Sequence, residues 1–340
     1  MRILKKLLLV IVVVVVALAG IGMFLPRNVH VERSTVINAP PATVFALVNG
    51  YKMFNKWSPW SMRDPQAKYT YEGPEFGVGA KFLWASEKSD VGTGSQEIVE
   101  SRPPEAVKVK LDFGGQGTAI SDWALAPEAG GTKTTWSCDI DMGAGPVGRY
   151  FGLMMDKWIG ADYAKGLENL KAVAEALPKD DFAGLRVEQI EAQPLTVAFV
   201  STTSAKDNAA IAAVIGASYV KVGQFMTKNG LKQAAAVQTI NHKYDDSGYQ
   251  FDAAIPVDHA PEKEVPSDSP VQVKQTYSGK ALKVVHKGAY QNMETTYRQM
   301  VAYMAAHGYE GAASPWDEYV SDPGETPEPE LVTNIVWPIK

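Results

Sequence analysis

The chain has 340 residues, which at about 150 residues per domain predicts two domains, each large enough to bury its own core. Hydrophobic residues make up 46% and charged residues 21% of the sequence, so neither a disordered chain nor a multi-pass membrane protein fits the whole. The 33 Lys and Arg against 38 Asp and Glu give a net charge of -5, which supplies no electrostatic basis for binding nucleic acid. The single cysteine, Cys138, excludes an internal disulfide and a multi-cysteine metal cluster.

The N-terminal segment is apolar. Residues 7–25 form an uncharged run that is long enough as a helix to cross the ~30 Å hydrocarbon layer of a membrane. Arg2, Lys5 and Lys6 precede this run, and positive charge favours the cytoplasmic side. We therefore expect residues 1–27 to be a single-pass signal anchor in a bacterial inner membrane, with the N-terminus cytoplasmic and the soluble domains periplasmic.

A cleaved secretory peptide is the alternative for the same segment. Ala17-Leu18-Ala19 resembles the small-residue site at which such peptides are cleaved. The apolar run continues beyond Gly20 to Leu25, which favours the anchor. Both interpretations place the soluble part of the chain outside the cytoplasm.

The next 150 residues, about 28–177, predict an antiparallel α+β domain. A strand over 30–38 is followed by a helix that opens at Pro40 and Pro41, where a fixed φ suits the first helical turn. Alternating runs separated only by turns then predict strands that pair antiparallel. These runs are 68–71, 80–86, 94–100, 107–113, 117–125 and 132–141, and an amphipathic helix over about 147–177 follows them.

Several motifs in this region match a known family. They are Phe54-Asn55-Lys56-Trp57-Ser58-Pro59-Trp60, Tyr71-Glu72-Gly73-Pro74, Gly77-Val78-Gly79-Ala80 and the strand that holds Trp84. Together they resemble the polyketide cyclase/dehydrase branch of the START-like (SRPBCC) helix-grip superfamily, over about 29–177. The resemblance implies a curved sheet wrapped on a long C-terminal helix, with a hydrophobic ligand held between them.

Tryptophans are the candidate ligand contacts of this domain. An apolar cavity lined by large aromatic side chains would suit a hydrophobic ligand, whereas ordinary core packing is the alternative for each of them. The candidates are Trp57, Trp60, Trp84, Trp123 and Trp158.

A short polar linker at 178–184 leads to a second domain over 185–340, in which one pattern occurs twice. The first copy predicts a strand at 187–203, a helix at 205–228 and strands at 234–241 and 249–256. The second copy predicts a strand at 277–286, a helix at 291–307 and strands at 316–320 and 331–337. Two β-α-β-β halves imply a pseudo-twofold pair with a groove between the helices and the shared sheet.

The second domain resembles the GyrI-like, or AraC-type effector-binding, domain. The residues that carry the likeness are His286-Lys287-Gly288-Ala289-Tyr290, Trp316-Asp317-Glu318-Tyr319 and Asp322-Pro323. The resemblance implies a site for aromatic, often cationic small molecules, with the acid at the position of Glu318 facing the ligand. The family often serves as the sensor of a DNA-binding regulator, but this sequence contains no helix-turn-helix module.

Glu318 is the strongest single candidate, since a partly desolvated carboxylate between Trp316 and Tyr319 would attract a cation. Tyr290 and His286 flank the start of the second helix and could orient the ligand. A solvated glutamate on an edge strand, with packing roles for the aromatic residues, is the alternative.

No cofactor or metal is expected. Residues 143–148 match GxGxxG, but Pro146 removes an N–H that would bind phosphate and the strands before it are antiparallel. The five histidines are scattered without metal-ligand spacing.

These observations predict an exported, membrane-tethered protein with two ligand-binding domains that senses, sequesters or transfers small molecules. One alternative is a hydrolase for strained-ring or electrophilic compounds, with Glu318 as general base and Tyr290 as proton donor. A second alternative is an envelope structural or partner-binding protein. The sequence identifies no protein partner.

Overall fold

The computed structural model describes residues 2–114 and 117–340, and it divides into two compact units. The first unit runs to Ala183 and includes Ala305–Gly308, and the second comprises Gly184–Met304 and Tyr309–Lys340. Each contains its own sheet with helices, so the predicted α+β class is confirmed. Met1, part of the predicted anchor, lies outside the described residues.

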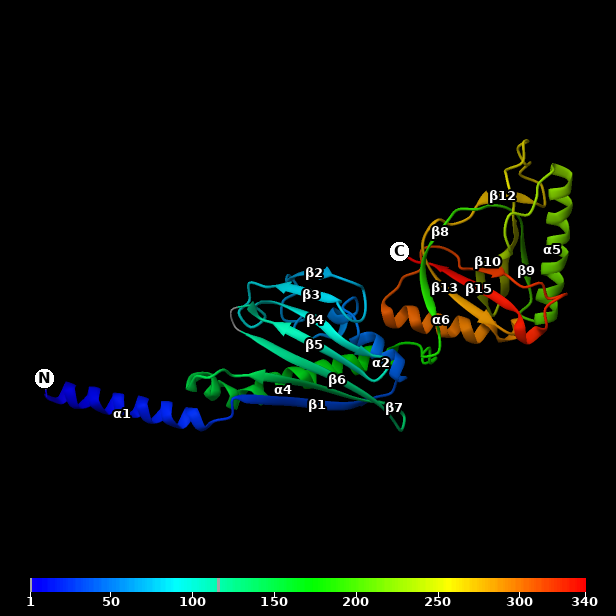
Figure 1. Cartoon of the computed structure of the whole chain (residues 1–340). Helices are drawn as coiled ribbons and strands as arrows, with labels where there is room; N and C mark the ends of the chain where they lie inside the picture. The colour runs from blue at the N-terminus through cyan, green and yellow to red at the C-terminus, as the bar shows by residue number, and fades with distance from the viewer. Residues whose placement is uncertain (1, 115–116) are drawn as a thin grey trace. The chain divides into compact units, whose positions relative to one another are not determined.

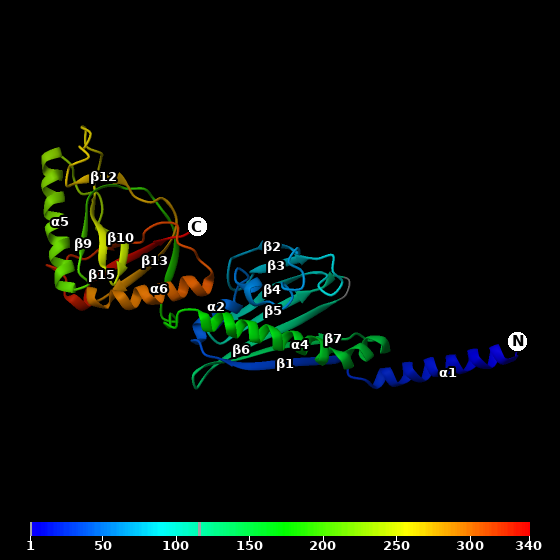
Figure 2. The same cartoon turned by 180° about the vertical axis from the view of Figure 1, so that it is seen from behind.

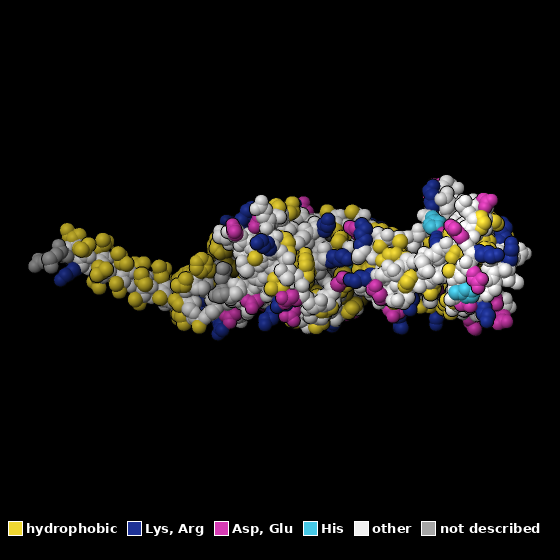
Figure 3. All heavy atoms as spheres, turned by 90° about the horizontal axis from the view of Figure 1, so that it is seen from above, with side chains coloured by type: hydrophobic (Ala, Val, Ile, Leu, Met, Phe, Trp, Pro, Cys, Tyr) yellow, Lys and Arg dark blue, Asp and Glu magenta, His cyan; other side chains and the backbone are white. Residues whose placement is uncertain are grey.

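The apolar N-terminal run forms one helix, α1 (Arg2–Phe24), whose side chains are almost all exposed. Figure 3 shows hydrophobic side chains covering the visible face of this helix. Among the described residues, two helices are long and apolar enough to cross a membrane, Ile3–Phe24 and Asn208–Asn229. Length and composition alone are weak evidence that a helix spans a membrane.

The first unit is a seven-stranded antiparallel sheet packed against a long helix (Figure 1). The sheet has the order β1-β7-β6-β5-β4-β3-β2, so six successive strands form the predicted meander and β1 pairs with the last of them. The strands are β1 (Asn28–Ile37), β2 (Lys68–Glu72), β3 (Lys81–Ala85), β4 (Thr93–Arg102), β5 (Ala106–Asp112), β6 (Thr118–Glu128) and β7 (Gly131–Asp141). The helices are α2 (Pro41–Val48), α3 (Phe54–Trp57) and α4 (Pro146–Ala176).

Prolines set the start of two helices in this unit. Pro41 is the first residue of α2 and Pro146 the first of α4, positions at which the missing N–H costs no helical hydrogen bond. The buried face of α4 includes Tyr163, Leu167 and Leu170, which join the core cluster of the sheet. This packing places the interior of the unit between α4 and the concave side of the sheet (Figure 2).

The second unit is an eight-stranded antiparallel sheet, in the order β12-β9-β11-β10-β14-β15-β13-β8. Its strands are β8 (Val187–Ala192), β9 (Thr196–Ser204), β10 (Val237–Asp245), β11 (Gly248–Pro256), β12 (Gln272–Gln275), β13 (Gly279–Lys287), β14 (Trp316–Tyr319) and β15 (Val332–Pro338). Its helices are α5 (Asn208–Asn229) and α6 (Met293–His307), with 3-10 turns η2 (Tyr290–Asn292) and η3 (Glu328–Glu330). The predicted duplication is present as β9-α5-β10-β11 and β13-α6-β14-β15, and the two halves pair through β10 and β14.

Each helix covers its own half of this sheet. Side chains of α5 pack on Tyr249 and Phe251 of β11, and Met300 of α6 packs with Leu282 and Ile335 of β13 and β15. Asp207 caps α5 by accepting a hydrogen bond from the backbone N–H of Ala210 at 2.9 Å. The centre of the sheet, where β10 meets β14, lies between the two halves.

One predicted strand was wrong. The run 187–203 is two strands, β8 and β9, which pair with different partners. Pro194 lies between them, and proline lacks the N–H that a continuous ladder would need. The short elements α3 and β12 were also absent from the sequence prediction, because four-residue segments carry too little periodicity.

Candidate functional sites

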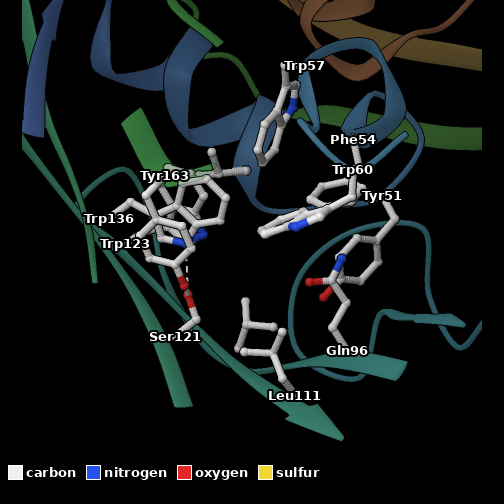
Figure 4. Close-up of a pocket in the computed structure, with 12 residues that line it drawn as sticks. Tyr51, Phe54, Trp57, Trp60, Gln96, Leu111, Ser121, Trp123, Trp136 and Tyr163 are labelled. Atoms are coloured by element: carbon white, nitrogen blue, oxygen red, sulfur yellow. Dashed lines mark hydrogen bonds between the residues drawn. The ribbon is translucent and has the colours of Figure 1, made fainter. Parts of the chain in front are cut away.

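The interior of the first unit holds a small, enclosed cavity of about 30 Å³, roughly the space of one water molecule. Its walls come from α2, α3, α4 and strands β4 to β7 (Figure 4). The lining residues are mainly aromatic and include Tyr51, Phe54, Trp57, Trp60, Gln96, Ser121, Trp123, Trp136 and Tyr163.

Stacked rings fill most of this interior. Trp136 lies between Trp123 and Tyr163, with ring centroids 4.4 Å and 3.8 Å away and nearly parallel planes. Trp57 meets both tryptophans edge to face, at 5.6 Å and 5.9 Å. Rings in such arrangements attract one another beyond the burial of their area, so the packing is a stable alternative to a bound ligand.

The polar atoms of this cavity divide into satisfied and unsatisfied groups. The indole N–H of Trp136 donates to the Ser121 hydroxyl at 2.8 Å (Figure 4). Tyr51 is 5% exposed, and its hydroxyl finds no hydrogen-bond partner among the described residues. Burial raises the pKa of Tyr51, so the group remains a neutral donor. A buried hydroxyl without a partner is costly, so a hydrogen bond from it to a polar group of a ligand would stabilise the complex.

The structure brings together three of the five candidate tryptophans. Trp57, Trp60 and Trp123 line the cavity, and Trp60 also donates to Asp162 at 3.1 Å. Trp84 packs at the edge of the core cluster and donates to the carbonyl of Val91, outside the lining. Trp158 lies on the outer side of α4 with 47% of its surface exposed.

A buried carboxylate occupies the centre of the second unit. Asp317 on β14 is 4% exposed, and three neutral groups donate hydrogen bonds to it. The Tyr297 hydroxyl of α6 donates at 2.7 Å, the Asn241 amide of β10 at 3.0 Å and the Thr239 hydroxyl at 3.1 Å. Within residues 2–114 and 117–340, no Lys, Arg or His lies within ion-pair distance of Asp317.

Burial raises the pKa of Asp317 to about 6, against the lowering effect of the hydrogen bonds from Tyr297, Asn241 and Thr239. The carboxyl therefore titrates close to neutrality.

Further tyrosines surround Asp317. The Tyr319 hydroxyl lies 3.2 Å from the Thr239 hydroxyl, and the Tyr249 hydroxyl donates to the Asn241 side-chain oxygen. Burial and the nearby Asp317 raise the pKa of Tyr297 and of Tyr319 well above their usual value, which keeps both hydroxyls neutral. Asp317 thus lies among phenol rings and hydroxyls, an environment suited to a cation or a hydrogen-donating ligand.

Glu318, the acid that the sequence prediction selected, lies on the opposite face of the sheet from Asp317. Its carboxylate accepts one hydrogen bond from the Trp316 indole and one from the Asn334 amide, each at 3.0 Å. Trp316 and Glu318 share one face because successive strand residues alternate, so Asp317 and Tyr319 share the other. The acid among Tyr249, Tyr297 and Tyr319, which we call the tyrosine cluster, is therefore Asp317.

Of the other predicted residues, Tyr290 contacts the tyrosine cluster. Its ring meets that of Tyr319 edge to face with centroids 5.4 Å apart, and 36% of its surface is exposed. His286 is buried, and its ring nitrogens contact the Thr296 hydroxyl at 2.8 Å and the Ala289 carbonyl at 3.2 Å. These two bonds hold His286 at the connection between β13 and α6.

Comparison with known families assigns both units. Residues 28–175 match the model described as polyketide cyclase / dehydrase and lipid transport, and residues 186–340 match the GyrI-like small molecule binding domain. The chain is a fusion of these two families. Both are small-molecule-binding families, so ligand binding is the shared property of the START-like and GyrI-like domains.

Several solved structures resemble the chain weakly. The crystal structure of the EcmrR C-terminal domain is 18% identical and covers 46% of this chain and 98% of that one, with a TM-score of 0.40. A cryo-EM structure of an EcmrR-DNA complex is 17% identical and covers 57% and 72%, with a TM-score of 0.41. A hydrolase from Listeria innocua is 14% identical and covers 46% and 92%, with a TM-score of 0.34. None of these likenesses carries an activity over to this chain, and no curated protein matches it.

Proposed function

We propose that this chain is a membrane-anchored small-molecule-binding protein whose GyrI-like domain captures an aromatic cation through Asp317. The observation that carries the proposal is the buried Asp317 carboxylate, whose hydrogen-bond donors among the described residues are all neutral. With a pKa of about 6, most of it is ionised at pH 7. A buried charge of this kind is costly, and a cationic ligand would offset that cost.

The tyrosines around Asp317 favour an aromatic ligand. Rings of Tyr290 and Tyr319 meet edge to face, and Tyr290 is partly exposed, so an entering molecule would meet it first. A cation over a tyrosine face gains about 0.5 to 2 kcal/mol. An aromatic cation would interact with both the carboxylate and the rings.

The START-like domain supplies a second binding interior in this proposal, for a hydrophobic ligand with one polar group. The unpartnered Tyr51 hydroxyl at the cavity wall would pair with that group. Because the cavity is only about 30 Å³, such a ligand enters only when rings such as Trp136 move aside. We therefore place the higher affinity in the GyrI-like domain.

Two features of the first unit support anchoring at a membrane. The apolar side chains of α1 are exposed along its length, and the first half of α4 also exposes apolar residues, which are Val147, Phe151, Leu153, Met154 and Trp158. The Tyr150 hydroxyl donates to the Leu18 carbonyl of α1 at 2.8 Å, so α4 begins beside the end of α1. Aromatic residues there suit the interface between lipid and water.

Alkaline carbonate extraction of cell membranes tests the anchor. We expect the full chain to remain in the membrane pellet, whereas a chain in which Val13 and Val14 are both replaced by Arg should be released, since each charge at the helix centre costs about 2.5 to 3.5 kcal/mol. Release of the unchanged chain would contradict anchoring.

Calorimetric titration with tetraphenylphosphonium, an aromatic cation, tests the ligand site. The full chain in detergent is compared with Asp317→Asn and with Glu318→Gln, a matched loss of the neighbouring acid on the other face. We expect at least tenfold weaker binding for Asp317→Asn and unchanged binding for Glu318→Gln. Equal affinities for all three proteins would contradict the role of Asp317.

A further inference from the structure

A second cavity lies on the face of the GyrI-like sheet opposite Asp317. Its volume is about 190 Å³, somewhat larger than an engineered cavity of about 150 Å³ that binds benzene. Its apolar wall includes Ile240, Tyr277 and Trp316, and its polar wall includes His242, Lys274 and Ser314. The cavity therefore has room for a small organic molecule with polar groups on one side.

A chain of hydrogen bonds links three side chains beside this cavity. Asp252 of β11 is buried, and His242 Nε2 lies 2.8 Å from its Oδ2 atom. His242 Nδ1 lies 3.1 Å from the Ser314 hydroxyl oxygen. The Ser201 hydroxyl donates to the other oxygen of Asp252 at 2.6 Å, and Lys274 Nζ also contacts the carboxylate. The order serine, histidine, aspartate is thus present in space although the residues are far apart in sequence.

Charge determines which ring nitrogen of His242 carries the proton. Burial alone would raise the pKa of Asp252, but the hydrogen bonds from Lys274, Ser201 and His242 hold it below its usual value, so the group is a carboxylate. A carboxylate only accepts hydrogen bonds, so His242 Nε2 carries the hydrogen. In the neutral ring Nδ1 is then a lone-pair acceptor, and the Ser314 hydroxyl donates to it. This is the relation between a nucleophile and its general base.

We propose that this cavity is a hydrolytic site for small esters, with Ser314 as nucleophile, His242 as general base and Asp252 as the positioning residue. His242 Nδ1 takes the hydroxyl proton while Ser314 Oγ bonds to the ester carbonyl carbon. The alcohol then leaves with that proton as the ester bond breaks, and an acyl-serine remains. A water molecule that loses a proton to His242 attacks the acyl-serine carbonyl. The acyl–Oγ bond then breaks, the carboxylic acid leaves, and His242 returns the proton to Ser314 Oγ.

Lys274 supports this chemistry electrostatically. Its ammonium has three hydrogens, contacts Asp252 and lines the same cavity, so a hydrogen that Asp252 does not accept is available to the ester carbonyl oxygen as that oxygen becomes negative. The rings of Tyr277 and Trp316 suit a short or aromatic acyl group. The site shares no residue with the Asp317 cluster and does not depend on the proposed function.

Acylation of the full chain by p-nitrophenyl acetate tests the proposal. We expect a burst of nitrophenolate that approaches one equivalent per chain and an acetyl group on Ser314 by peptide mass spectrometry. Ser314→Ala should abolish the burst and His242→Gln should slow it at least 100-fold. Ser247→Ala is the matched control, since Ser247 is exposed and bonded to Asp245 without a histidine.

Further variants separate positioning and binding roles. Asp252→Asn should slow the burst, and Asp252→Glu, which keeps a carboxylate, should restore part of the rate, whereas a purely structural Asp252 would show no such rescue. Asp317→Asn should leave the burst intact, so failure of the cation site and failure of this site are distinguishable. Acetylation elsewhere than Ser314, or an equal burst from Ser314→Ala, would overturn the proposal.

Discussion

The interiors of the two domains differ in what they bury. The START-like domain buries stacked rings around Trp136, and the Tyr51 hydroxyl at its small cavity has no partner among the residues that the structure describes. The GyrI-like domain buries the Asp317 carboxylate among hydroxyls and an amide. A ligand of the first domain must displace packed side chains, whereas the second domain holds a buried negative charge that a bound cation would stabilise. Two domains from ligand-binding families can therefore differ in whether their interiors oppose or favour the entry of a ligand.

The largest expected effect comes from removing a ring of the first interior. Trp136 is 4% exposed between Trp123 and Tyr163, so Trp136→Ala should lower the free energy of unfolding by about 3 to 5 kcal/mol. Trp158→Ala is the matched control, since that ring is 47% exposed, and its cost should be below about 1 kcal/mol. Urea unfolding of the full chain provides both values. A similar cost for the two variants would show that the rings around Trp136 are not a packed core.

A smaller effect distinguishes two buried tyrosines. Tyr297→Phe removes a donor to the Asp317 carboxylate and should cost about 1.5 to 3 kcal/mol, whereas Tyr51→Phe removes an unpartnered hydroxyl and should be neutral or slightly stabilising. The same substitution is therefore expected to destabilise the second domain but not the first. Urea unfolding at pH 7 measures both, and a clear loss of stability in Tyr51→Phe would imply a partner for its hydroxyl.

Much of the fold could be predicted from local patterns. Alternation and turn residues gave the meander of the first unit, and self-similarity gave the two β-α-β-β halves of the second. The break at Pro194 was missed because the apolar pattern continues on both sides of it. The tightness of the first interior could not be predicted, because the number of tryptophans does not tell whether their rings pack on one another or around a space.

Strand alternation in β14 separates residues that the sequence analysis placed at one ligand. Trp316, Glu318 and Tyr319 were predicted to face one ligand, although a strand cannot place neighbours 318 and 319 on the same face. Tyr319 together with strand alternation would have selected Asp317. Asn241 and Tyr297 come from other elements, and only the tertiary fold brings them to Asp317. The roles of Glu318 as a general base and of the chain as a structural protein stay predictions.

Proton release on cation binding tests the central claim, that Asp317 is the anion that meets the ligand. The carboxyl has a pKa of about 6 in the folded protein, so about half of it is protonated at pH 6, and a bound cation favours the ionised form. Affinity should therefore fall as pH drops below about 6. Titration with tetraphenylphosphonium at pH 6, in two buffers with different ionisation enthalpies, measures the protons released. We expect about half a proton per cation for the unchanged chain and none for Asp317→Asn. Binding without proton release, or release that persists in Asp317→Asn, would contradict the claim.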